Sequence, residues 1–171
     1  MKNLIIKKKI FNMNDAFTIY DHNDNILFET KNEGDIRNSV YTLVDPSSGS
    51  KTRIYKEIEK KSILYHIDIK GDKIVTITTN KGLRTKRFSV EPGGLTIKAN
   101  SSKLIFKLRD GSEELGRVET KLLRFKDTYF VDILNPSEET MYILIALAII
   151  IDERDPSFIG GIFKNIESIL P

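Results

Sequence analysis

The chain offers few of the side chains that usually carry catalysis or bind metals. Its 171 residues include no cysteine, and its two histidines are His22 and His66. A thiol nucleophile, a disulfide framework, an acylated cysteine and a cysteine-based metal site are therefore excluded. No Gly-x-Ser-x-Gly elbow occurs that would present a nucleophilic serine. We expect His22 in an exposed turn and His66 on a strand surface, with no enzymatic activity, no cofactor and no metal site.

Two short motifs resemble ligand-binding loops but lack residues that such loops require. Residues 21–25 supply the first three ligand positions of a calcium loop, yet Ile26 stands where the loop needs glycine. Residues 111–116 have the spacing of a phosphate-binding loop, but Arg117 follows where lysine is needed. Both motifs therefore indicate turns between strands.

Local charge is the remaining chemical signal. The net charge is +3, from 27 Lys+Arg against 24 Asp+Glu, which is too small to indicate nucleic-acid binding. Basic residues nevertheless cluster within 7–9, 51–61, 81–87 and 117–126, whereas acidic residues collect within 15–35. Charge clustering alone selects five candidate ligand-binding residues: Lys51, Arg53, Arg84, Lys86 and Arg87.

These clusters have two interpretations. A basic side of the molecule would attract anionic phospholipid headgroups, at about 1 kcal/mol for each lysine or arginine near the membrane. Alternatively, the basic residues form a solvated strand face, on which lysine prevents edge-to-edge pairing of sheets.

The elements that carry these residues are mostly short strands. Apolar and polar residues alternate from about residue 4 to residue 134, and β-branched and aromatic residues dominate windows such as 17–20, 64–69 and 85–90. Turn residues separate the windows at regular intervals. The pattern predicts about twelve short strands in a sandwich or a barrel.

The period changes after Pro136, where a helix is expected over about 137–152. The run from Met141 to Ile151 is apolar on every face, but it is far shorter than the roughly 20 residues of a membrane span. A helix that is apolar all round must be buried on all sides. The pattern therefore predicts a helix enclosed by a barrel, where Ala146 and Ala148 keep it slim.

The last residues form a separate unit in this interpretation. Apolar residues recur at spacings of three and four between Phe158 and Leu170, which is typical of an amphipathic helix. We expect a barrel domain over 1–153 and an amphipathic tail over 154–171. The tail either packs on the barrel exterior or docks on a partner or membrane.

Several segments together resemble the LURP-one-related family. They are the opening hairpin at 17–28, the strands at 65–68 and 86–90, and the closing strand 127–133 followed by a hydrophobic helix that ends at Asp152. The resemblance covers about residues 4–153. It implies the tubby C-terminal-like fold, a closed barrel of about 12 antiparallel strands around a central helix, which phospholipid scramblases share. It also implies a binding or regulatory role, and it carries over no binding residue.

We therefore expect a non-enzymatic binding module that engages anionic phospholipid headgroups through a basic barrel face. The alternative is a protein-interaction or structural domain that docks through its C-terminal helix. The N-terminus lacks a secretory signal, and Lys2 replaces the glycine needed for myristoylation. The expected location is the cytoplasm, peripheral at the inner membrane surface, and the oligomeric state stays open.

Overall fold

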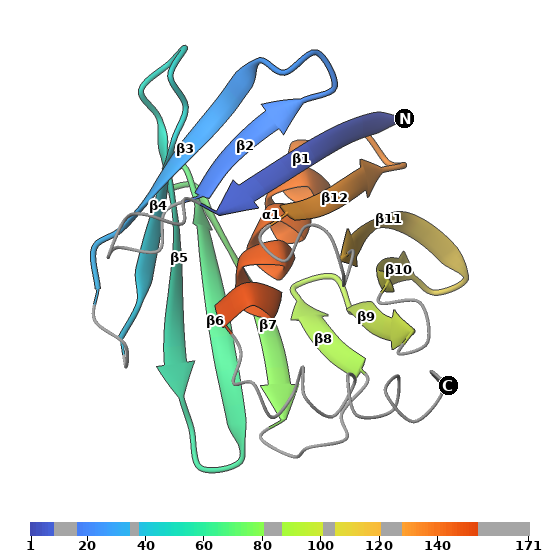
Figure 1. Ribbon diagram of the computed structural model, residues 1–171. Coiled ribbons are helices and arrows are strands. Elements are labelled where there is room, and N and C mark those ends of the chain that lie inside the picture. Colours follow the sequence, from blue (N-terminus) through green and yellow to red (C-terminus); the bar gives the residue numbers. More distant parts are fainter. Residues whose placement is uncertain (9–16, 35–37, 81–86, 101–104, 121–127, 154–171) are drawn as a thin grey trace, which may run out of the picture.

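The structure is a computed structural model that describes residues 1–8, 17–34, 38–80, 87–100, 105–120 and 128–153. Within these ranges the chain forms twelve strands and one helix (Figure 1). Their bounds are β1 (Lys2–Lys8), β2 (Phe17–Asp21), β3 (Ile26–Asn32), β4 (Val40–Val44), β5 (Lys51–Ile58), β6 (Ser62–Ile69), β7 (Lys73–Asn80), β8 (Arg87–Glu91), β9 (Leu95–Asn100), β10 (Ile105–Asp110), β11 (Glu113–Thr120), β12 (Thr128–Ile133) and α1 (Glu138–Glu153).

The strands form a closed antiparallel barrel. Each strand pairs with its neighbours in sequence, and β1 pairs with β12 to close the ring, with Lys2 opposite Ile133 and Lys7 opposite Thr128. The expected fold class, a mostly β protein with a twelve-stranded barrel and a C-terminal helix, is thus confirmed. Because the ring is closed, none of these strands is an edge strand.

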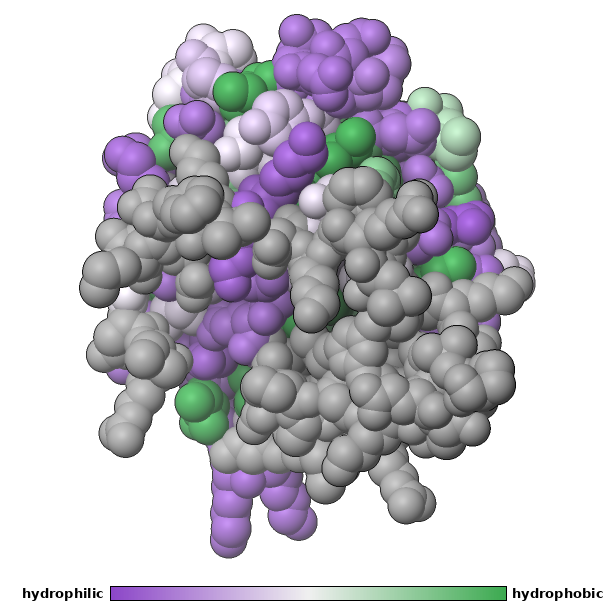
Figure 2. All heavy atoms as spheres, in the orientation of Figure 1, coloured by the Kyte–Doolittle hydropathy of each residue, from purple (hydrophilic) through white to green (hydrophobic). Residues whose placement is uncertain are grey.

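The predicted alternation separates an inner from an outer face on each strand. On β6, Tyr65, Ile67 and Ile69 are buried, whereas His66 and Asp68 between them are partly exposed. Outward positions of the barrel carry most of the charged side chains. The face visible in Figure 2 is accordingly hydrophilic over most of its described part, with small separate hydrophobic patches.

The helix α1 runs through the inside of the barrel (Figure 1). Its buried residues, Tyr142 to Ile151 without interruption, face every direction around the helix axis. The helix starts where the Ser137 hydroxyl accepts a hydrogen bond from the Thr140 amide at 3.0 Å, and Glu138 and Glu139 lie in its positive first turn. Among the described residues, no helix is long and apolar enough to span a membrane.

The direction of α1 distinguishes two ends of the barrel. Lys73, the first residue of β7, pairs with Glu139 at the start of α1, and Lys8, the last residue of β1, pairs with Asp152 near its end. We call these ends the helix-N end and the helix-C end. Odd-numbered strands run toward the helix-C end, because neighbouring strands are antiparallel. The described turns at 22–25, 45–50, 70–72, 92–94 and 111–112 therefore lie at the helix-N end, and the turn at 59–61 lies at the helix-C end.

Two sequence expectations lie outside the described residues. The amphipathic tail over 154–171, and with it the proposed docking helix, is one of them. The other comprises Arg84 and Lys86, two of the five candidate ligand-binding residues.

Candidate anion-binding surface

The structure separates the described members of the five candidates. Lys51 and Arg53 are exposed on the outer face of β5, in its half nearer the helix-N end. Arg87 begins β8 at the opposite end of the barrel, and β6 and β7 lie between the two strands. The five candidates, which are chosen because basic residues cluster in the sequence, therefore include residues from two separate regions of the surface.

Arg53 also has a carboxylate at the paired position on the next strand. Its partner in the β5–β6 register is Asp68, and both residues face outward. Opposite charges at paired positions stabilise a sheet, so part of the charge of Arg53 has a structural role.

Arg87 occupies one end of a row of basic positions across four neighbouring strands. In the register of β8 to β11, Arg87 is opposite Lys98, Lys98 is opposite Lys107, and Lys107 is opposite Arg117. We call these four residues the basic row. Neighbouring strands are about 4.8 Å apart, so the row extends for roughly 14 Å perpendicular to the strands.

The side chains of the last three members lie on the outer face. Lys98 is exposed, and Lys107 and Arg117 are partly exposed between buried neighbours on their strands. The row ends at Arg117, because the residue opposite Arg117 on β12 is the acidic Asp132.

One carboxylate neutralises part of the basic row. Glu114 lies 3.6 Å from the Lys107 ammonium (Oε2 to Nζ) and 2.7 Å from the Arg117 guanidinium (Oε1 to Nε). The second contact is a close charge pair without an aligned hydrogen bond, since neither Oε1 nor Nε has a hydrogen-bond partner. Lys98 makes no ion pair within the described ranges. The row therefore keeps positive charge facing solvent.

The contacts with Glu114 and the position of Asp132 opposite Arg117 give only part of this arrangement a structural role. Like charges at directly paired positions destabilise a sheet. Lysine can serve to block pairing at a sheet edge, but β8 to β11 each have two neighbours in the closed barrel. The basic row thus places like charges at directly paired positions within a closed sheet.

Sequence reasoning missed Lys98 and Lys107 because Lys98 stands among uncharged neighbours and Lys107 is followed closely by both Arg109 and Asp110, so neither lies in a basic run. Only the cross-strand register places them beside Arg87 and Arg117. The signal that identifies them is the register in which successive strands pair.

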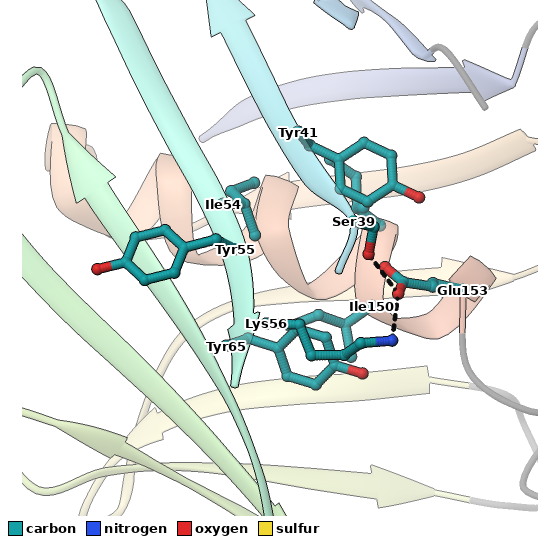
Figure 3. A pocket seen from close by; sticks show the side chains of 9 residues that line it. Ser39, Tyr41, Ile54, Tyr55, Lys56, Tyr65, Ile150 and Glu153 are labelled. Carbon is teal, nitrogen blue, oxygen red and sulfur yellow. Dashed lines mark hydrogen bonds and ion pairs between the residues drawn. The ribbon is translucent and has the colours of Figure 1, made fainter. Parts of the chain in front are cut away.

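At the helix-C end of the barrel, a network of polar contacts surrounds the last turn of α1 (Figure 3). The Glu153 carboxylate accepts hydrogen bonds from Lys56 Nζ at 2.8 Å and from Ser39 Oγ at 2.6 Å. Asp152 accepts bonds from Lys8 at 2.9 Å and from the Tyr129 hydroxyl at 2.6 Å. The adjoining hollow has about 180 Å³ of space but is too narrow to hold a water molecule. These residues anchor the helix.

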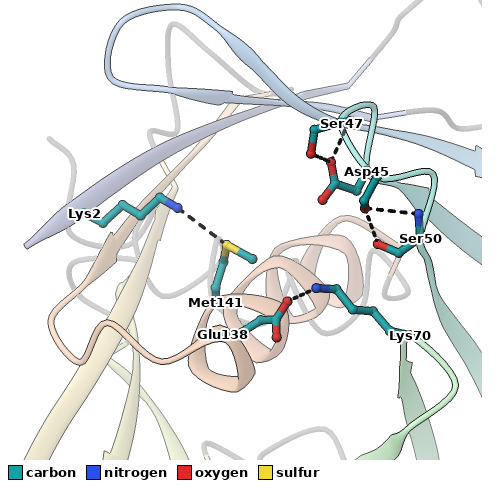
Figure 4. A network of polar contacts seen from close by, with 8 residues as sticks. Lys2, Asp45, Ser47, Ser50, Lys70, Glu138 and Met141 are labelled. Atoms are coloured by element: carbon teal, nitrogen blue, oxygen red, sulfur yellow. Dashed lines mark hydrogen bonds and ion pairs between the residues drawn. The ribbon is translucent and has the colours of Figure 1, made fainter.

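A matching set of contacts anchors the helix-N end (Figure 4). Lys70 pairs with Glu138, and Lys73 Nζ donates to Glu139 at 2.5 Å. The hydrogen bond from Lys70 to Glu138 raises the pKa of that ammonium group. In the neighbouring 45–50 turn, bonds donated by the Ser47 side chain and backbone lower the pKa of Asp45.

His66 lies half-buried on the outer face of β6 and bonds through both ring nitrogens. Nδ1 is 2.8 Å from the Thr76 hydroxyl, and Nε2 is 2.7 Å from the Glu57 carboxylate. This acid–histidine–hydroxyl series borders an open hollow on the side of Glu57 and Tyr55, and Thr76 lies on the other side, away from it. Thr76 does not line this hollow. The described residues contain no group of three side chains that would hold a metal ion.

Comparisons with known proteins match most of the chain. A family model described as LURP-one-related matches residues 2–152. The chain is 30% identical over 154 residues to the uncharacterised protein YxjI of Bacillus subtilis (strain 168), and the match covers 89% of this chain and 93% of that protein. No solved structure gives a significant match.

Proposed function

The chain belongs to the LURP-one-related family, and we propose that it is a binding module that engages anionic phospholipid headgroups through the basic row. The closed barrel around a central helix supports a tubby-like binding domain in general terms. The headgroup ligand is inferred from the chemistry of the surface.

The observation that carries this proposal is the register of the basic row. Four basic positions stand side by side on adjacent strands, with Glu114 paired to two of them. Phosphate groups attract lysine and arginine through charge-assisted hydrogen bonds. Near an anionic membrane each such side chain contributes about 1 kcal/mol, so three or four acting together give measurable membrane binding.

We propose that Lys51 and Arg53 contribute less to headgroup binding than the basic row does. They lie on a different part of the barrel from the basic row, and Arg53 is opposite Asp68. We expect them to contribute only weak, long-range attraction, which salt screens within about 10 Å. Arg84 and Lys86 are three residues and one residue before Arg87 in the sequence, and we propose that they contribute to headgroup binding together with it.

Sedimentation with lipid vesicles tests the proposal. We expect the protein to sediment with vesicles of phosphatidylcholine and phosphatidylserine and to stay in the supernatant with phosphatidylcholine alone. Added sodium chloride should release it, because the contacts are electrostatic. Equal binding to both kinds of vesicle would contradict the proposal.

Competition with inorganic phosphate identifies the source of the phosphate group. If lipid headgroups in a membrane are the ligand, phosphate should release the protein no better than sodium chloride at the same ionic strength. Release at a much lower phosphate concentration would show that a free phosphate compound is the ligand and would overturn the membrane proposal.

A further inference from the structure

The helix-N end of the barrel is rich in exposed carboxylates. Its turns and the strand ends beside them carry acidic residues at nearly every connection. Of its lysines, Lys70 and Lys73 are paired with carboxylates of α1, whereas Lys2 and Lys51 are exposed. The acidic residues of these connections are Asp21, Asp24, Asp45, Asp72, Glu91, Asp110 and Glu113.

Two of these carboxylates are held in the charged form by their own turns. Asp21 accepts hydrogen bonds from the Asn25 backbone and side chain, which lower the pKa of its carboxyl group. Asp45 is bound in the same way by Ser47, as described above. These two charged carboxylates of the helix-N end thus also stabilise the turns in which they lie, by accepting hydrogen bonds from other residues of the turn.

The helix-C end has the opposite character. Two of its acidic residues, Asp152 and Glu153, are each paired with a lysine at the barrel mouth, and its other described carboxylates are Glu33, Glu57, Glu59 and Glu119. Lys60 and Lys61 are exposed in the turn between β5 and β6. Hydrophilic side chains project from this turn at the bottom of the view in Figure 2.

The basic row lies in the same half of the barrel. Arg87 is the first residue of β8 at the helix-C end, Lys98 is two residues from that end of β9, and Lys107 is two residues from that end of β10. Exposed Lys31 stands next to the last residue of β3 at this end as well. Among the described residues, acidic side chains therefore outnumber basic ones toward the helix-N end, and basic side chains outnumber acidic ones toward the helix-C end.

From this polarity we propose that the barrel docks on an anionic bilayer with its helix-C end and the adjoining part of the β8–β11 face toward the lipid, and its helix-N end toward water. The proposal deepens the proposed function and rests on it. The helix α1 has 16 residues, which corresponds to about 24 Å between the two ends. That separation exceeds the screening length of roughly 10 Å, so the bilayer attracts the basic end while the acidic end lies outside its field.

Labels at the two ends test this orientation, and the absence of cysteine allows single labelling sites without further changes. Ser62 begins β6 at the helix-C end, and Ser48 lies in the 45–50 turn at the helix-N end. The variants Ser62→Cys and Ser48→Cys are matched, because each removes one hydroxyl that makes a local hydrogen bond. Each would carry a fluorophore and be mixed with phosphatidylcholine–phosphatidylserine vesicles that contain a headgroup-attached quencher.

We expect quenching at position 62 to be several-fold stronger than at position 48. A third label, from Ser112→Cys in the turn between β10 and β11, should resemble position 48, because it also lies at the helix-N end. It replaces position 48 if that variant melts differently from the unlabelled protein.

The outcomes separate this inference from the proposed function. Binding with equal quenching at both ends, or with stronger quenching at position 48, would overturn the orientation and leave headgroup binding intact. If the unlabelled protein does not bind these vesicles at all, the proposed function fails and the orientation fails with it.

Discussion

Gly116 on β11 lies where the barrel wall closely approaches the helix. A Cβ atom added there would lie 2.5 Å from Leu144 Cδ1 and 2.6 Å from the Asp132 carbonyl oxygen. Real Cβ atoms do not approach other heavy atoms so closely, and the carbonyl belongs to the backbone of β12. Glycine at this position is thus required by the packing of α1 against the wall.

We predict that Gly116→Ala lowers the free energy of unfolding by about 1–3 kcal/mol, the usual cost of overpacking a core. Chemical denaturation measures the change. Combining it with Leu144→Ala should recover part of the loss, because one of the two clashing atoms is removed. Strictly additive losses would contradict a direct contact between β11 and the helix.

Leu144 itself is fully buried in the middle of α1. We predict that Leu144→Asp prevents folding, because an unpaired carboxylate would be placed inside the barrel. The control Leu144→Met conserves the volume and should cost less than about 1.5 kcal/mol. Cooperative thermal melting of the aspartate variant, followed by circular dichroism, would show that the helix is not enclosed.

At the scale of elements, α1 is unusual in carrying acidic residues at its negative end. The helix dipole favours cations in the last turn, and that turn has none of its own. Lys8 from β1 and Lys56 from β5 supply the missing positive charge from two separate strands. The pairing fixes the depth of the helix in the barrel, since each carboxylate has one strand position from which a lysine reaches it.

We predict that Lys56→Met lowers the free energy of unfolding by about 2 kcal/mol, because it leaves Glu153 charged and mostly buried. The matched variant Lys73→Met breaks the pair with Glu139 at the other end of the helix. Side chains in the first pair are 13% and 16% exposed, against 47% and 33% in the second. The second variant should therefore cost under about 1 kcal/mol. Equal losses from both would contradict an anchoring role specific to the helix-C end.

The strands and the enclosed central helix could be predicted from the residue pattern, whereas the closed antiparallel order of the strands is implied by the family resemblance. Alternation along each strand is local, and a short helix apolar on all faces, Met141 to Ile151, has only an enclosing sheet to bury it. The basic row could not be predicted, because Lys98 and Lys107 become neighbours only through the pairing of β9 with β10. A shift of one residue in that pairing would mean that Lys98 and Lys107 no longer stand opposite each other. The amino-acid composition of the strands carries no information about this register.

The charge distribution of the whole molecule has the same origin. The sequence indicates early acidic and later basic stretches, but the barrel redistributes them, since successive turns alternate between its two ends. Lys51 begins β5 at the helix-N end, whereas Lys60 lies in the turn after β5 at the helix-C end. Charge polarity along the axis is therefore a property of the closed topology.

The central claim is that anionic headgroups bind at the basic row and not wherever the surface is positive. Two double variants that each remove two positive charges test it: Lys98→Gln with Lys107→Gln in the row, and Lys51→Gln with Arg53→Gln on β5. Partition onto phosphatidylcholine–phosphatidylserine vesicles would be measured for both and for the unmodified protein at one salt concentration.

We predict that the first variant loses about 2 kcal/mol of membrane binding, roughly a 30-fold lower partition coefficient, while the second changes by less than about 3-fold. Unchanged melting temperatures would confirm that both variants fold. Equal losses from the two variants, or a loss confined to Lys51 and Arg53, would contradict the assignment of the headgroup site to the basic row.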